Sequence, residues 1–292
     1  MSNTLELLSE HCCFGGRQRF YQHASSAIGL PMRFSVFLPP AALNAGARVP
    51  ALLYLAGLSC NDETFMAKAG AQRLAAELGL ALIAPDTSPR GAQVPGEADS
   101  WELGLAASFY LDATQAPWSA HYCMESYLAA ELLPLTCAAL PIDAQRIGIF
   151  GHSMGGHGAL TLALKHPLLF KSVSAFAPIC APTQCPWGKK AFSSYLGADA
   201  AAWQAHDATA LMTQHRSAPY PGGVLIDQGL NDQFLATQLY PQLFEAACAR
   251  AGQPLQLRRH AGYDHGYYFV ATFMQDHLAH HARQLFHRAQ AA

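Results

Sequence analysis

A serine stands in a glycine-rich segment with the spacing expected of a catalytic nucleophile. The segment reads Gly151-His-Ser-Met-Gly155 and matches the pattern Gly-x-Ser-x-Gly around Ser153. A short apolar stretch typical of a strand precedes it, and an Ala/Leu-rich stretch typical of a helix follows it. We therefore expect a sharp strand-to-helix turn that exposes the Ser153 hydroxyl above a sheet, an arrangement called a nucleophile elbow.

The two glycines fit the geometry of such a turn. Its backbone is strained, and the residues two before and two after the serine must be small so that strand and helix can approach each other. Gly151 and Gly155 meet this requirement. The turn also aims the N–H of Met154 at negative charge that develops beside Ser153, so Met154 is an expected oxyanion-hole donor. The alternative is a glycine-rich loop between two core elements.

The composition indicates a folded chain with enough apolar residues for a large core. Of 292 residues, 51% are hydrophobic and 13% are charged, and the net charge is -2. This charge gives no reason to expect nucleic acid or an anionic membrane surface as a partner. No apolar run approaches the length of a membrane span, and the first residues lack a basic region followed by a long apolar run, so we expect no secretory signal. We expect a soluble, cytoplasmic protein.

The eight cysteines are scattered along the chain, and none forms a Cys-x-x-Cys pair. A chain of this length does not need a disulfide framework, and the spacings do not resemble a zinc site. We expect reduced, mostly buried thiols rather than metal ligands or disulfides.

Strand and helix patterns alternate along the chain. Buried or alternating strands are predicted at 32–38, 51–56, 80–84, 146–150, 172–176, 224–227 and 255–259, with 17–24 as a hairpin partner of the first. Helices are predicted at 64–78, 121–140, 154–166, 234–250 and from 267 onward, with a kink or restart at Pro241. These patterns predict one doubly wound α/β domain over 1–292, with a mostly parallel sheet, N-terminal antiparallel strands and irregular, site-building insertions at about 85–118 and 177–220.

A serine nucleophile also needs a base, which this kind of fold supplies late in the chain, after the orienting acid. Six histidines follow the strand at 224–227. His260 ends a strand, whereas His265 lies in the Gly262–Gly266 loop between a strand and a helix, so we favour His265. We expect the remaining four on a solvated face of the terminal helix: His277, His280, His281 and His287.

The acid has two main candidates, Asp227 at the end of its strand and Asp232 in the following loop. Asp232 can reach over the top of the sheet toward His265, so we favour it. Asp227 is expected to brace the loop by accepting hydrogen bonds from backbone N–H groups. Asp264, next to His265, should point away because adjacent side chains diverge.

A second oxyanion donor is expected in the loop Gly57-Leu-Ser-Cys60, after the strand at 51–56. We choose the N–H of Leu58. Cys60 would then lie near the nucleophile without taking part in the reaction, and a simple packing role for its thiol is an equal alternative.

Together these segments make the chain resemble the S-formylglutathione hydrolases, also called esterase D, along nearly its whole length. The resemblance is carried by Leu55-Ala-Gly-Leu-Ser-Cys-Asn-Asp62, Pro85-Asp-Thr-Ser-Pro-Arg-Gly91, Phe109-Tyr-Leu-Asp-Ala-Thr114, Gly151-His-Ser-Met-Gly-Gly-His-Gly-Ala-Leu160, Cys185-Pro-Trp-Gly188, Asp232-Gln-Phe-Leu235 and Gly262-Tyr-Asp-His265.

The resemblance implies an α/β-hydrolase fold and hydrolysis of the thioester S-formylglutathione to glutathione and formate, with side activity on short-chain esters. It implies a small-molecule partner and no metal or organic cofactor, and it leaves a homodimer open. It places the triad on Ser153, Asp232 and His265. The same resemblance places the oxyanion donors on Leu58 and Met154, and the pocket residues on Cys60 and Trp187.

The chain departs from the family pattern at three places. It has Ala56 and Gly266 where members have serine, and Glu102 to Tyr110 replaces a glycine-rich segment. These changes bear on the acyl pocket and on the loop of His265. A general short-acyl carboxylesterase is the main alternative, followed by an acyltransferase and a non-catalytic binding protein. For the glutathionyl carboxylates, Arg90, Lys189 and Lys190 are candidates at the mouth, with solvated surface charge as the alternative.

Overall fold

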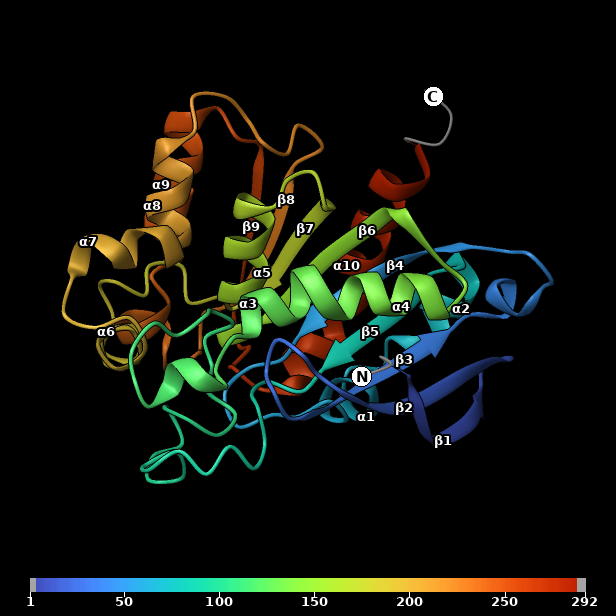
Figure 1. The fold of residues 1–292 in the computed structure, drawn as a ribbon. Coiled ribbons are helices and arrows are strands. Elements are labelled where there is room, and N and C mark those ends of the chain that lie inside the picture. The colour runs from blue at the N-terminus through green and yellow to red at the C-terminus, as the bar shows by residue number, and fades with distance from the viewer. Residues whose placement is uncertain (1–3, 288–292) are drawn as a thin grey trace.

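The computed structural model describes residues 4–287, in which nine strands form one sheet (Figure 1). The strand order is β1-β2-β3-β5-β4-β6-β7-β8-β9. The strands are β1 (Glu6–Cys13), β2 (Gly16–Ala24), β3 (Pro31–Leu38), β4 (Val49–Leu55), β5 (Ala81–Pro85), β6 (Ile142–His152), β7 (Phe170–Phe176), β8 (Val224–Gly229) and β9 (Leu255–His260).

The predicted sheet architecture is confirmed. Strands β1, β2 and β3 pair antiparallel, and β3 joins β5 antiparallel. All pairs from β5 to β9 are parallel, and the buried strands β4 and β5 have no exposed residue. Strand β1 was not predicted, because it lies at the sheet edge, where most of its residues are exposed and leave no alternating pattern.

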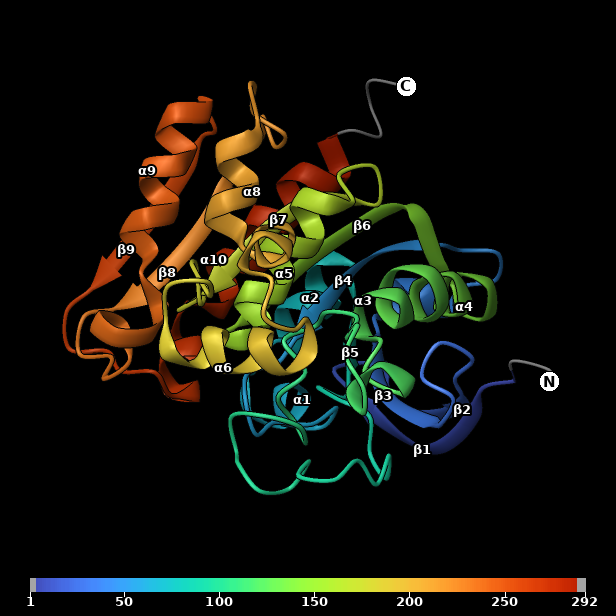
Figure 2. The ribbon, with the colours of Figure 1, turned by 60° about the vertical axis from the view of Figure 1, so that its left-hand side comes forward.

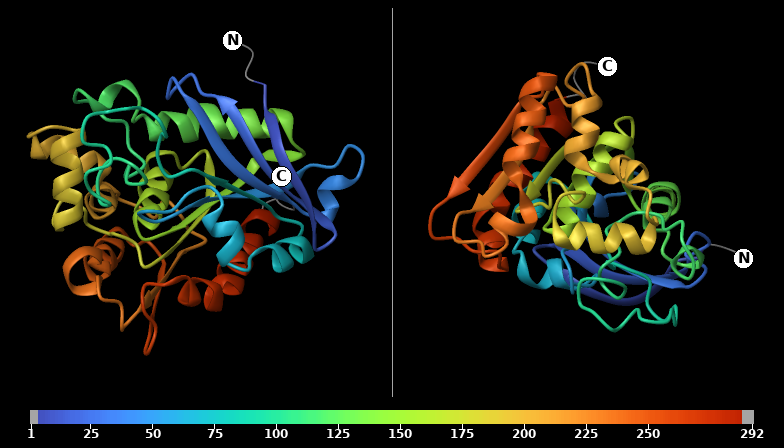
Figure 3. Two further views of the ribbon diagram at one scale, coloured as in Figure 1. Left: turned by 90° about the horizontal axis from the view of Figure 1, so that it is seen from below. Right: turned by 90° about the vertical axis from the view of Figure 1, so that its left-hand side faces the viewer.

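Helices cover both faces of the sheet. Figure 3 shows α3 and α4 on one side of the strands and α10 on the other. No helix among residues 4–287 combines the length and apolar character needed to cross a membrane. The helices are α1 (Thr64–Lys68), α2 (Gln72–Leu78), α3 (Met124–Ser126), α4 (Leu133–Ala139), α5 (Met154–Lys165), α6 (Pro186–Tyr195), α7 (Ala200–Trp203), α8 (Ala208–Gln214), α9 (Pro241–Ala251) and α10 (Tyr267–His287).

The helices agree with some of the predictions and differ from others. The single helix predicted at 64–78 is wrong, because Gly70 at φ +66° separates α1 from α2. The restart predicted at Pro241 is confirmed, since Tyr240 at φ 49° separates a π-helical turn from α9. The segment 177–220 is less irregular than expected, because it contains α6, α7 and α8. These helices are too short for periodicity to reveal.

The long loop between β5 and α3 runs beside α6 (Figure 2). Tyr195 of α6 fastens the two together, because its hydroxyl accepts a hydrogen bond from the N–H of Gly104 and donates one to the carbonyl of Ala107. An ion pair between Lys190 and Glu102 adds a second link. The loop that departs from the family pattern is therefore held at several points.

The terminal helix contradicts one expectation. His277 and His281 are fully buried and His280 is 7% exposed, so these side chains do not form a solvated face. Helix α10 packs its histidines onto β6 and β7, where Gly148 leaves room: a Cβ there would lie 2.8 Å from His281 Nδ1. The side chain of His287 lies outside the described residues.

The buried histidines belong to one hydrogen-bonded chain that begins at a carboxylate. Asp227 can only accept, so His277 donates from Nε2 over 3.2 Å and its Nδ1 accepts from Ser174 over 2.8 Å. His281 Nε2 then donates to Ser174 over 2.9 Å, and its Nδ1 accepts from Ser172 over 2.6 Å. In this assignment each ring has one bare nitrogen, as a neutral imidazole does.

Burial opposes the charged form of these rings. It lowers the pKa of His277 and His281 below the ordinary value, and it lowers the pKa of His280 to about 4. In the unfolded chain the same groups take up protons near pH 6.5. The stability that these neutral rings contribute should therefore be present at pH 7 and be lost as the pH falls below about 6.5.

We predict that the free energy of unfolding falls by at least about 2 kcal/mol between pH 7 and pH 5. Urea unfolding at both pH values measures this change. The variant His281→Gln should show a smaller fall, because it lacks one titrating group, whereas His11→Gln at an exposed position should behave like the parent. An unchanged pH dependence in His281→Gln would contradict this account.

Candidate active site

Ser153 stands alone between the end of β6 at His152 and the start of α5 at Met154. Its backbone has φ 59° and ψ −120°, a strained conformation for a residue with a side chain. Strand and helix meet closely here: a Cβ on Gly151 would lie 2.2 Å from the Gly155 oxygen, and one on Gly155 would lie 1.9 Å from the Leu55 oxygen. The turn therefore has the predicted geometry.

Asp232 and His265 are brought together over the ends of β8 and β9. The distance between Asp232 Oδ2 and His265 Nδ1 is 2.5 Å. The carboxylate also accepts hydrogen bonds from Gln228 Nε2 at 3.2 Å and from the N–H of Phe234 at 2.8 Å. Asp264 points elsewhere, as expected, and accepts from the N–H of Gly266. The aspartate thus fixes the ring so that Nε2 is free for chemistry.

The loops that carry the two residues are joined by their backbones. Asn231 donates its N–H to the Tyr263 oxygen over 2.9 Å, and Leu230 donates to the His260 oxygen over 2.9 Å. Gly229 permits this approach, because a Cβ there would lie 2.4 Å from the Tyr263 oxygen. The alignment of acid and base is therefore a property of two connected loops.

Asp227 lies in a separate network below this site. Its carboxylate is fully buried, forms an ion pair with the partly exposed Arg258, and contacts His260 Nε2 at 3.1 Å and His277 Nε2 at 3.2 Å. The hydrogen bonds of its carboxylate come from side chains, so the expected bonds to loop N–H groups are absent among the described residues. The Arg258 guanidinium and His277 hold the pKa of Asp227 below its ordinary value despite burial.

The N–H groups of Leu58 and Met154 lie on the two segments beside Ser153. Met154 is the first residue of α5, so no helical carbonyl accepts its N–H. Leu58 lies in the loop after β4, where its N–H serves no backbone hydrogen bond among residues 4–287. A Cβ on Gly57 would lie 3.1 Å from Ser153 Cβ, which brings this loop directly against the serine.

Neighbouring segments hold the Leu58 loop in place. The Tyr110 hydroxyl donates to the Ala56 oxygen over 2.8 Å, and the N–H of Ser59 donates to the Ala106 oxygen over 3.1 Å. Ala106 has φ 58°, a conformation that favours glycine, and it lies in the segment that replaces a glycine-rich one. The changed segment thus keeps its backbone shape at a local cost of about 1 kcal/mol.

A cavity of about 270 Å³ opens above Ser153. Cys60 and Trp187 lie on its wall, together with four residues that the sequence reasoning missed: Trp101, His152, Phe234 and Tyr267. Three aromatic rings pack against one another along this wall: the ring centre of Trp187 lies 5.3 Å from that of Trp101 and 4.7 Å from that of Phe234. The positions of Phe234 and His152 inside the Asp232 and Ser153 motifs could have indicated them. The cavity is small and mostly aromatic.

Two titratable groups beside the serine are kept neutral. His152 is buried with its ring centre 4.5 Å from that of His265, and burial followed by His265 lowers its pKa well below the ordinary value. Burial raises the pKa of the Cys60 thiol. Neither group can therefore compete with His265 as base or with Ser153 as nucleophile at neutral pH. Across residues 4–287, no three His, Cys, Asp or Glu side chains could together hold a metal ion.

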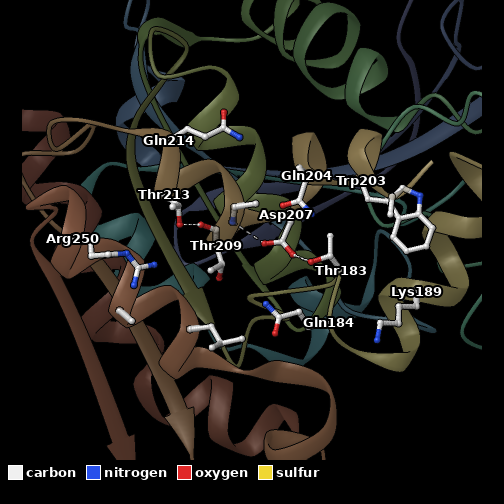
Figure 4. A pocket seen from close by; sticks show the side chains of 14 residues that line it. Thr183, Gln184, Lys189, Trp203, Gln204, Asp207, Thr209, Thr213, Gln214 and Arg250 are labelled. Carbon is white, nitrogen blue, oxygen red and sulfur yellow. Dashed lines mark hydrogen bonds between the residues drawn. The ribbon is translucent and has the colours of Figure 1, made fainter. Parts of the chain in front are cut away.

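The three cations suggested for the mouth do not line this cavity. Arg90 binds Asp86 and the Cys60 oxygen, and Lys190 binds Glu102, so both brace loops. Lys189 lies beside a separate cavity of about 850 Å³, bordered by α6, α7, α8 and α9 (Figure 4). None of these three cations therefore lies on the wall of the cavity at Ser153.

The chain is similar to known proteins in sequence and in fold. The Esterase family model, described as "Putative esterase", matches residues 25–280. The chain is 51% identical to the S-formylglutathione hydrolase of Rattus norvegicus (96% of this chain, 99% of the relative) and 50% identical to that of Paracoccus denitrificans (98% and 100%). A solved S-formylglutathione hydrolase from Agrobacterium tumefaciens superposes with a TM-score of 0.92 at 48% identity (96% and 99%).

We predict that Asp232→Asn and Asp227→Asn have different effects. Asp232→Asn should lower kcat for a short aryl acetate by about three to four orders of magnitude, because the ring of His265 loses its fixed tautomer, and the protein should remain folded. Asp227→Asn should lower the free energy of unfolding by about 2 kcal/mol or more, because it leaves Arg258 without its buried partner. Aryl acetate kinetics and urea unfolding of both variants measure this. The reverse pattern would exchange the roles of the two residues.

Proposed function

The chain belongs to the S-formylglutathione hydrolase family of esterases, and we propose that Ser153, Asp232 and His265 carry out its hydrolysis of S-formylglutathione to glutathione and formate. One observation above all supports this assignment. The contact of 2.5 Å between His265 and Asp232 lies beside a strained serine, and Ser153 and His265 line the same cavity. This is the arrangement of a nucleophile, a base and an orienting acid.

The reaction begins with attack on the thioester carbonyl. His265 Nε2 takes the hydroxyl proton as the Ser153 oxygen bonds to the carbonyl carbon. Asp232 stabilises the imidazolium that forms. The negative charge moves to the former carbonyl oxygen, where the N–H groups of Leu58 and Met154 hold it.

The tetrahedral intermediate then collapses. The bond between carbon and sulfur breaks, the glutathione thiolate leaves, and the His265 imidazolium can return the proton to it. Because a thiolate leaves more readily than an amine, this step needs little further assistance. Ser153 is left as a formyl ester.

Water completes the cycle. His265 removes a proton from a water molecule that attacks the formyl ester, and the same two N–H groups stabilise the second oxyanion. The carbon-to-Ser153 bond breaks, the proton returns to the serine oxygen, and formic acid leaves and ionises to formate in water. No metal or organic cofactor takes part in these steps.

The cavity suits a small acyl group. Its volume of about 270 Å³ and its wall of Trp187 and Phe234 leave room for formyl and for short alkyl groups. The aromatic wall favours side activity on short-chain esters, which is the activity of a general carboxylesterase. The formyl thioester remains the proposed principal substrate.

We also propose that the enzyme acts in the cytoplasm. All eight cysteines lie within the described residues and are free thiols, which fits a reducing compartment. Comparing fractionated cells for activity and for the protein itself tests the location.

A homodimer is a further part of the proposal. Support comes from the edge strand β1, which in the described part of the chain pairs with β2 alone and exposes Leu7 and Leu8. Sedimentation of the purified protein tests this, and a monomer at micromolar concentration would contradict it.

We predict that Ser153→Ala abolishes hydrolysis of S-formylglutathione, with kcat at least about 10⁴-fold lower and an unchanged urea midpoint. Thioester hydrolysis by that variant at the parent rate would rule out Ser153 as the nucleophile.

For the parent protein, we predict that kcat/KM is higher for S-formylglutathione than for its acetyl and lactoyl counterparts and for a short aryl acetate. A preference for the aryl acetate would favour the general carboxylesterase.

A further inference from the structure

A second cavity of about 570 Å³ adjoins the catalytic one. Tyr267, the first residue of α10, lines both cavities. Lys68 at the end of α1 stands on one side, with its Nζ 5.9 Å from the centre of the Tyr267 ring. The other lining residues belong to the loop of His265 and the start of α10: Asp264, Gly266, Tyr268 and Ala271. Tyr267 is therefore common to the walls of both cavities.

The cavity presents opposite charges that are not paired with each other. Lys68 and Asp264 are both exposed, and within residues 4–287 neither forms an ion pair. One carboxylate oxygen of Asp264 accepts from the N–H of Gly266, and no side chain in the described chain donates to the other. A ligand with a negative and a positive group could bind both residues at once.

Lys68 is also the one lysine or arginine that lines either cavity near Ser153 in the described chain. Arg90 and Lys190 have acidic partners, and Lys189 faces a different cavity. Lys68 therefore supplies the available positive charge close to the reacting atoms. Tyr268, which is 90% exposed, provides an apolar surface at the rim.

We propose that this second cavity binds the γ-glutamyl end of the glutathionyl group, with Lys68 pairing its α-carboxylate and Asp264 pairing its α-ammonium. The inference rests on the proposed function. Of the three parts of glutathione, the γ-glutamyl end carries both charges, whereas the glycine end carries a carboxylate alone. The ring of Tyr268 packs against the methylene chain between the charged end and the peptide bond.

Two formyl thioesters test the proposal: S-formylglutathione, and N-acetyl-S-formyl-cysteinylglycine, in which an acetyl group replaces the γ-glutamyl group and keeps the cysteine nitrogen as an amide. For the parent, kcat/KM should be higher for the first. Lys68→Met should lower the ratio of the two kcat/KM values about fivefold, through KM of S-formylglutathione, and Asp264→Asn should lower it about threefold. Lys68→Arg should largely keep the ratio, because the charge remains. Lys189→Met is the matched control, since it removes a lysine from another cavity, and it should leave the ratio unchanged.

Several results would overturn the proposal. If Lys68→Met lowers kcat/KM equally for both thioesters, Lys68 binds the glycine carboxylate that both share, or it only stabilises the fold. If Asp264→Asn raises the ratio, the cavity binds a carboxylate alone. Variants that keep the parent ratio would refute this subsite while leaving the proposed function intact. A parent protein that hydrolyses an aryl acetate but neither thioester would instead refute the proposed function, and the subsite with it.

Discussion

The close approach of three backbones around Gly151 and Gly155 is the constraint on which the site depends. A single added carbon on Gly155 would lie 1.9 Å from the Leu55 oxygen, so β4, β6 and α5 can meet only because that position has no side chain. Their meeting holds Ser153 at φ 59° and places the start of α5 and the loop after β4 on either side of it. Nucleophile and both proposed oxyanion donors thus follow from one packing contact.

The acid and base depend on a second junction, at the ends of β8 and β9. Gly229 lets the loops of Asp232 and His265 touch, and backbone hydrogen bonds lock them together. Beneath them, the buried network of Asp227, Arg258 and His277 anchors α10 to the sheet. Such a network specifies one arrangement of helix and strands, since each buried group needs its partner. By fixing the start and end of the loop between β9 and α10, this network helps to hold His265 in position at the cavity that the same loops line.

Much of this could be predicted from local sequence. The elbow has a distinctive spacing, the chain order of serine, acid and base limits the choices, and buried parallel strands appear as continuous apolar runs. Features that depend on contacts between distant parts of the chain could not be predicted in this way. Helical periodicity does not tell which sheet residues face α10, so the serines and glycine that receive its histidines were missed. Arg90 and Lys190 looked free because their acidic partners, Asp86 and Glu102, become partners only in the folded loops. The cavity of Lys68 combines segments almost 200 residues apart.

The central claim is that the formyl group passes through an ester on Ser153. Acid quenching during turnover of S-formylglutathione, followed by peptide mass spectrometry, tests it most directly. The account predicts a formyl group on the peptide that contains Ser153, attached at its hydroxyl, and none on Cys60, whose thiol lines the same cavity but stays protonated. A formyl group on Cys60, with Ser153 unmodified throughout turnover, would contradict it.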